Sequence, residues 1–136
     1  MLQKMTNNLR YFSGLTFIFS LAFFYLLYTD LSIQHFNHIW IYVVAYGSLL
    51  CISGLTLGYK DSVRNTRLDL GFQYHFITFI IVNCIGIVAF LTLMEVTAET
   101  LIASFLSILF WALGLGVHYY FSSKSIKGFD KEDIFD

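Results

Sequence analysis

Four long stretches without Asp, Glu, Lys or Arg alternate with short polar segments along the chain. The uncharged stretches cover residues 11–28, 39–59, 76–94 and 101–121, and each is 18 to 21 residues long. At about 1.5 Å of rise per residue, an 18-residue helix is about 27 Å long, close to the roughly 30 Å hydrocarbon core of a bilayer. The pattern therefore predicts an all-α integral membrane protein built as a four-helix bundle.

The eight Lys and Arg residues divide unevenly among the segments between these stretches. They precede the first stretch, separate the second from the third, and follow the fourth: Lys4, Arg10, Lys60, Arg64, Arg67, Lys124, Lys127 and Lys131. The two remaining connections, residues 29–38 and 95–100, contain none. Because cytoplasmic loops of membrane proteins carry the excess of basic residues, we predict two antiparallel transmembrane hairpins with both termini in the cytoplasm.

The composition agrees with this topology and argues against several classes of function. Hydrophobic residues make up 57% of the chain and charged residues 12%, whereas a soluble domain is about half apolar and a quarter charged. The net charge of −1 provides no basic field for nucleic acid. Uncharged spans argue against a charge-lined channel or a proton-coupled transporter. No nucleotide-binding glycine loop, nucleophile with a spaced base, or zinc-protease motif is present. We expect one membrane domain, residues 1–136, without enzymatic activity.

Small residues recur at helical spacing on two of the predicted helices. On residues 39–59 they form one face at steps of 4, 3 and 4: Gly47, Cys51, Gly54 and Gly58. On residues 101–121 a small and polar face has steps of 3, 4, 3 and 4: Ser104, Ser107, Trp111, Gly114 and His118. Small side chains let helix backbones come close in lipid, so we expect these faces to pack against other helices. Cys51 and Cys84 both lie within spans, and we expect no disulfide between them.

Polar residues within or beside the spans are the candidates for a site. In an antiparallel hairpin, His75 and His118 fall at the same cytoplasmic level. We interpret them as a structural clasp, completed by Gln73, Tyr74 or Tyr119. The alternative is a pair of ligands to haem or a transition metal, because imidazole suits these metals.

Asn83 and the polar residues of the outward connections are weaker candidates for a site. Asn83 lies in the middle of a span, and we expect it to form an interhelical hydrogen bond with Ser104 or Ser107. The outward connections would gather five polar residues on the opposite surface: Asp30, His35, His38, Glu95 and Glu99. A solvated interfacial loop explains them, and an outward cation site is the alternative.

The second half of the chain resembles a bacterial family, the two-transmembrane-helix or 2TM domain. His75, three residues, an aromatic residue, two residues and Val82-Asn83 match the pattern of its first helix. Trp111-x-x-Gly114-Leu-x-x-His118 matches that of its second helix. The resemblance covers about residues 72–136. It implies a bacterial hairpin with a cytoplasmic tail, which in the family stands alone or forms the membrane end of sensor histidine kinases. It assigns no catalytic residue.

These observations favour an accessory, anchoring or sensory module of the bacterial inner membrane. We expect the lipid bilayer, further copies of the chain or other membrane proteins as partners, and a cytoplasmic partner for the tail, residues 124–136. Two alternatives stay open: a haem- or metal-binding subunit that uses His75 and His118, and a small oligomeric pore or membrane effector. Residues 15–18 lie 62 positions before the similar residues 77–80, which raises the question of a tandem duplication.

Overall fold

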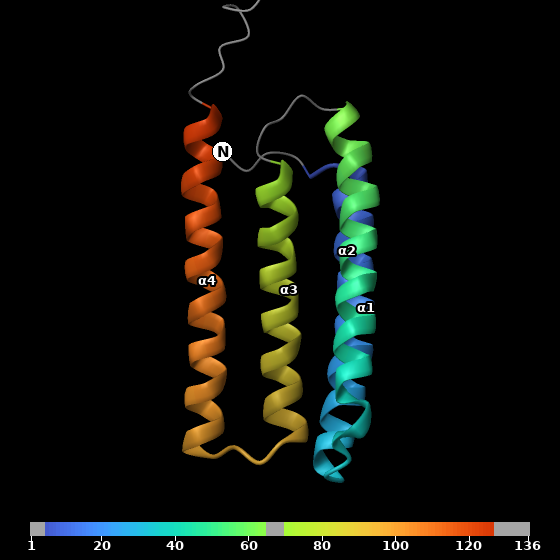
Figure 1. Ribbon diagram of the computed structural model, residues 1–136, viewed down its shortest axis with the longest axis vertical. Helices are drawn as coiled ribbons and strands as arrows, with labels where there is room; N and C mark the ends of the chain where they lie inside the picture. Colours follow the sequence, from blue (N-terminus) through green and yellow to red (C-terminus); the bar gives the residue numbers. More distant parts are fainter. Residues whose placement is uncertain (1–4, 65–69, 127–136) are drawn as a thin grey trace, which may run out of the picture.

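The computed structural model describes residues 5–64 and 70–126, and all regular structure in these ranges is helical. Four α-helices and one 3₁₀ turn follow one another along the chain: α1 Asn7–Ser32, η1 Phe36–His38, α2 Ile39–Arg64, α3 Leu70–Leu93 and α4 Ala98–Ile126. Each α-helix is antiparallel to the preceding one (Figure 1). The predicted basic segment around Arg67 and most of the tail lie outside the described residues.

All four α-helices are long and apolar enough to cross a membrane. This confirms the predicted all-α fold with four membrane-length helices. The helices extend beyond the apolar stretches at most ends; α1, for example, begins at Asn7 and ends at Ser32. The difference has a simple cause: a change from apolar to polar side chains marks the edge of the lipid, whereas a helix ends where its backbone hydrogen bonds end.

Threonine side chains cap the N-termini of two helices. The Thr6 hydroxyl accepts a hydrogen bond from the backbone N–H of Leu9 at 3.1 Å and so caps α1. At the start of α4, Thr97 and Thr100 exchange bonds between side chain and backbone: Thr97 Oγ1 accepts from the Thr100 N–H at 3.2 Å, and Thr100 Oγ1 accepts from the Thr97 N–H at 3.0 Å. These bonds satisfy backbone donors that have no partner within the helix.

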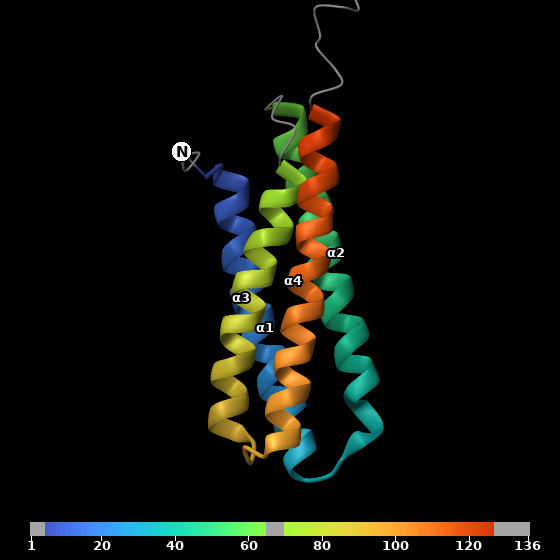
Figure 2. The same cartoon turned by 90° about the vertical axis from the view of Figure 1, so that its left-hand side faces the viewer.

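Helix α1 is central to the packing. It lies against α2 on one side and α3 on another, whereas α4 approaches α3 alone among the described helices (Figures 1 and 2). The buried side chains lie mainly on α1 and α3, with Asp61 as the buried residue of α2: Leu9, Phe12, Thr16, Ser20, Asp61, Leu70, Tyr74, Val82, Ile85 and Phe90. No α4 side chain whose exposure is described is buried.

Small residues mark the closest approaches of α1 to its neighbours. Thr16 and Ser20 are 0% exposed, and the Ser20 hydroxyl is 2.7 Å from that of Tyr46 on α2. A Cβ atom at Gly86 of α3 would lie 2.9 Å from Cζ of Phe24, and one at Gly54 of α2 would lie 3.4 Å from Cε2 of Phe12. Aromatic rings of α1 therefore fit against glycines of both neighbours.

Candidate functional site

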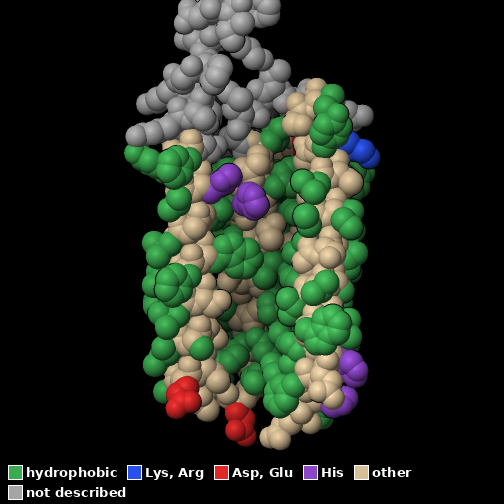
Figure 3. All heavy atoms as spheres, in the orientation of Figure 1, with side chains coloured by type: hydrophobic (Ala, Val, Ile, Leu, Met, Phe, Trp, Pro, Cys, Tyr) green, Lys and Arg blue, Asp and Glu red, His purple; other side chains and the backbone are tan. Residues whose placement is uncertain are grey.

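The four histidines form two pairs at opposite ends of the bundle (Figure 3). His75 and His118 lie near the end that holds the start of α1 and the end of α4. His35 and His38 lie near the connection from α1 to α2. The chain thus has two candidate sites that are separated by the length of the helices.

His75 of α3 and His118 of α4 lie against each other. Their ring centroids are 5.2 Å apart, and the rings meet edge to face at 78°. The Phe72 ring extends the contact to His118 at 6.5 Å and to Tyr119 at 5.0 Å. Both imidazoles are exposed. The pair joins α3 to α4 through ring contacts and offers two nitrogen ligands, which is fewer than a closed metal site requires.

Tyr74, one of the predicted neighbours of this pair, faces the other way and belongs to a network around Asp61. The Asp61 carboxylate on α2 is 2% exposed. Its Oδ2 accepts hydrogen bonds from the hydroxyls of Thr6 and of Tyr74, the latter at 2.9 Å. Its Oδ1 accepts from Nδ2 of Asn8 at 2.8 Å. One carboxylate thus ties the start of α1 and the first turns of α3 to α2.

Sequence reasoning missed the Asp61 network, although the chain contains a signal for it. Asp61 lies two positions after the end of the apolar stretch 39–59 and so falls in the predicted connection between the second and third spans. It also lies three residues after Gly58 and seven after Gly54, so it continues the small face of that helix. A carboxylate on a packing face, opposite the hydroxyl and amide donors of another segment, is a candidate for a buried network.

Only part of the predicted small face of α2 packs against other described residues. Gly54 packs against Phe12, but a Cβ atom added at Gly47 or Gly58 would have no neighbour within 4 Å. Gly47 is exposed, and Cys51 is exposed as a free thiol. The face that α2 turns toward α1 includes Tyr46, which the sequence analysis did not select. Most of the small face is therefore not covered by the other residues that the structure describes.

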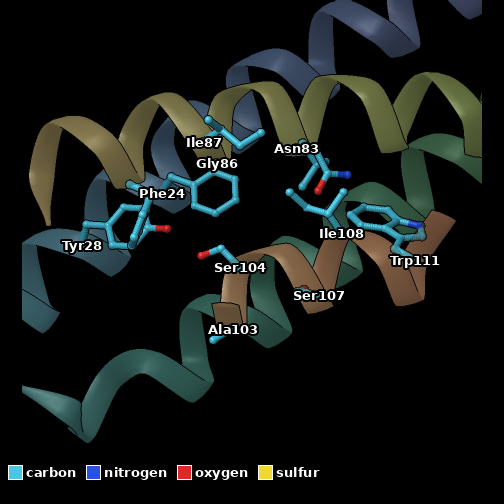
Figure 4. A pocket seen from close by; sticks show the side chains of 12 residues that line it. Phe24, Tyr28, Asn83, Gly86, Ile87, Ala103, Ser104, Ser107, Ile108 and Trp111 are labelled. Atoms are coloured by element: carbon cyan, nitrogen blue, oxygen red, sulfur yellow. The ribbon is translucent and has the colours of Figure 1, made fainter. Parts of the chain in front are cut away.

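A groove of about 380 Å³ opens between α1, α3 and α4. Asn83, Trp111 and Ile108 lie at one end and Phe24 and Tyr28 at the other, while Ser104 points into the space between (Figure 4). Its lining also includes the small residues Gly86 of α3 and Ser107 of α4. The groove therefore combines aromatic and aliphatic walls with the Asn83 amide and three hydroxyls, those of Tyr28, Ser104 and Ser107.

The expected bond from Asn83 to α4 is not formed. The Asn83 amide instead donates to the carbonyl oxygen of Phe79 on its own helix, at 2.7 Å. The groove separates Asn83 from Ser104 and Ser107, so the amide satisfies its donor locally, as short polar side chains do when no partner is within reach. The contact between α3 and α4 in this region is aromatic: the rings of Phe79 and Trp111 meet edge to face at 5.5 Å. At Gly114 an added Cβ atom would meet nothing within 4 Å.

At the opposite end, three of the five residues predicted on the outward surface come together. One ligand atom from each of Asp30, His35 and His38 lies within 4.8 Å of the other two. Glu95 and Glu99, in the connection and first turn before α4, are not members of this group.

Comparison with known proteins leaves the chain without an assigned relative. No family model matches it, and no curated protein or solved structure is significantly similar to it.

Proposed function

We propose that this chain is a non-catalytic, multi-pass protein of the bacterial inner membrane that acts as an accessory, anchoring or sensory module. The observation that carries the proposal is the incomplete packing of the fourth helix. α4 approaches α3 alone among the described helices and buries none of its described side chains. An apolar helix surface is stable in lipid, but a surface with small and hydroxyl residues favours contact with another helix.

The groove beside α4 supports assembly with a second copy or another membrane protein. Gly86, Ser104 and Ser107 line it, and they are the residue types through which transmembrane helices approach one another. The largely free small face of α2, with Gly47, Cys51 and Gly58, supports the same proposal. Both surfaces lie on helices at the outside of the bundle.

The proposed orientation has both termini and the α2–α3 connection in the cytoplasm, with the helices as two antiparallel hairpins. It rests on the one-sided distribution of Lys and Arg. The resemblance of residues 72–136 to the 2TM domain is part of the proposal and supports a bacterial origin. A cytoplasmic partner for the tail would connect the membrane module to a soluble protein.

Gentle-detergent affinity purification, followed by cross-linking and identification of co-purifying chains, tests the assembly. We expect wild-type protein to be recovered as an oligomer or with a membrane partner. Ser104→Phe should fill the groove and reduce this recovery. Leu113→Phe is the matched control, because position 113 lies nine residues away, on the opposite side of an ideal helix. Recovery of wild-type protein as an isolated monomer, both from native membranes and after cross-linking, would contradict the proposal.

A haem- or metal-binding subunit is the second candidate, and the contact between His75 and His118 favours it. Two neutral imidazoles can supply the axial ligands of haem or two ligands of a copper or zinc ion. Since the two rings now touch, they would have to separate to admit a haem between them. Protein purified from its native membrane would show a Soret band or a bound transition metal that His75→Ala and His118→Ala both remove. If instead both variants lower the folded yield and no such signal exists, the structural clasp is the better interpretation.

A further inference from the structure

The strongest feature outside the proposed assembly surfaces is a set of three different ligand groups where α1 passes into α2. Asp30 offers a carboxylate, and His35 and His38 each offer an imidazole nitrogen. Two histidines and one carboxylate form a donor set typical of zinc and of other divalent transition metals. Calcium and magnesium prefer sites built entirely from oxygen ligands. The chemistry of the donors therefore selects a class of metal.

The separations between the three ligand atoms are close to those found around a bound zinc ion. They lie within 4.8 Å of one another. Around a tetrahedral zinc ion with bonds of about 2.0–2.2 Å, neighbouring ligand atoms are about 3.3–3.6 Å apart. The three groups therefore need to move together by about 1.5 Å at most. His35 and His38 are exposed and Asp30 is half-buried, so small side-chain rotations suffice.

The backbone brings these three side chains together by a specific turn. After α1 ends, Gln34 adopts a left-handed conformation, with φ 56°, which is uncommon for a residue other than glycine. This conformation reverses the chain, and the N–H of His35 donates to the carbonyl oxygen of Asp30 at 2.8 Å. The turn thus places His35 beside the last turn of α1.

The 3₁₀ turn η1 then aligns the two histidines. His35 immediately precedes η1 and His38 ends it, so the tight 3₁₀ turn keeps the two residues close along the backbone. The two imidazole centroids are 5.3 Å apart with the rings at 81°.

Tyr42 on α2 supports the carboxylate from outside the ligand set. Its hydroxyl donates to Oδ2 of Asp30 at 3.0 Å. Metal-binding carboxylates are generally oriented by such a hydrogen bond, and its loss commonly weakens metal binding 10- to 100-fold. Asp30 is therefore already held toward the turn that carries the two histidines.

We infer that Asp30, His35 and His38 bind one divalent transition-metal ion, with zinc as the representative, at the end of the bundle opposite His75 and His118. Three protein ligands leave a fourth position for water or for a group of a partner. The ion would join the end of α1 to the start of α2. This inference goes beyond the proposed assembly and holds whether or not the chain has a partner protein.

Titration of the full chain with Zn²⁺ alone tests this site. The protein is purified in detergent with a tag that contains no histidine, treated with a chelator and dialysed. Binding is then measured by calorimetry and by competition with a chromogenic chelator. We expect saturable binding of one ion per chain. His35→Gln or His38→Gln should each weaken it at least about 10-fold, and Tyr42→Phe about 10-fold.

Two controls assign the binding to this end of the molecule. Asn37→Ala changes a non-ligand in the same 3₁₀ turn, and the double variant His75→Gln/His118→Gln removes the imidazoles at the other end; both should bind Zn²⁺ as wild type does. The visible spectrum of wild-type protein loaded with Co²⁺ provides a readout that needs no variant, and we expect the pattern of tetrahedral nitrogen and oxygen ligands.

Three results of the Zn²⁺ titrations would overturn the inference. They are no saturable Zn²⁺ binding by wild-type protein, unchanged binding by the double variant His35→Gln/His38→Gln, and loss of binding in the His75→Gln/His118→Gln control. A Co²⁺ spectrum typical of octahedral coordination by water would also contradict the proposed ligand set.

Discussion

At the scale of single residues, polar side chains near the helix ends perform different tasks. Asp61 accepts hydrogen bonds from Thr6, Asn8 and Tyr74 and is almost fully buried. His75 and His118 touch each other but stay exposed. Burial makes the hydrogen bonds of Asp61 more important for stability, because a buried polar atom that loses its protein partner cannot bond to water instead. The stability of the bundle should therefore depend more on Asp61 than on the histidine pair.

Asp61→Asn is the direct test of this dependence. The substitution retains the shape of the side chain but removes its charge and replaces an accepting oxygen with a donor, which then meets other donors. We expect the free energy of unfolding to fall by about 1.5–3 kcal/mol, the usual contribution of a hydrogen bond to a charged group.

The measurement is reversible unfolding in mixed micelles, with Glu95→Gln as the control. Glu95 is an exposed carboxylate in the connection before α4, so its replacement should change the stability by no more than about 0.5 kcal/mol. Equal effects of the two substitutions would mean that the Asp61 network does not stabilise the fold.

At the scale of helices, α1 organises the bundle through residues of little hydrophobic character. Thr16 and Ser20 are completely buried, and Phe12 and Phe24 of the same helix lie against glycines of α2 and α3. The small residues at helical spacing in the sequence instead predict packing faces on α2 and α4. The close approaches involve one glycine per partner helix, each facing an aromatic ring of α1.

Gly86→Val should therefore disturb the contact between α1 and α3. A Cβ atom at this position would already lie 2.9 Å from Cζ of Phe24, so the two extra methyl groups of valine force the ring or the helix to move. Overpacking of this kind typically costs about 1–3 kcal/mol.

Gly58→Val on α2 is the matched control, because an added Cβ atom there meets nothing within 4 Å. Both substitutions place the same β-branched residue in a helix, so the difference between their unfolding free energies isolates the contact with Phe24. If both variants are equally stable, the α1–α3 contact is looser than the structure indicates.

At the scale of the whole molecule, the two halves of the chain pack unequally. α1 and α2 contact each other along much of their length, whereas α4 makes a smaller contact with α3 and lies beside a groove. If the halves arose by duplication, their packing has since diverged. The second half, with α3 and α4, is the one whose second helix has the larger uncovered surface, which suits assembly with another protein.

The orientation of the whole molecule can be measured by labelling single cysteines. With Cys51 and Cys84 replaced by Ser, Glu95→Cys should react with a membrane-impermeant maleimide in intact cells. Lys60→Cys should react only after the membrane is opened, because the basic segments are predicted to face the cytoplasm. The reverse pattern of labelling would place both termini outside.

The sequence by itself determined which segments are helices able to cross a membrane. Charge is excluded from stretches of membrane length, and a backbone in lipid must satisfy its hydrogen bonds within the segment, so apolar length alone specifies the four helices. Spacing along two antiparallel helices also predicted that His75 and His118 would approach each other, because their depth depends on position along the helix and not on side-chain detail.

Only the tertiary structure decided which faces of the helices meet. In lipid no hydrophobic contrast distinguishes one apolar face from another, so contacts depend on the fit of particular side chains. That fit packs α1 against both α2 and α3. It also leaves the Asn83 amide bonded within its own helix and buries Asp61 among three donors. Likewise, the left-handed turn at Gln34 brings Asp30, His35 and His38 together, and no period in the sequence specifies that turn.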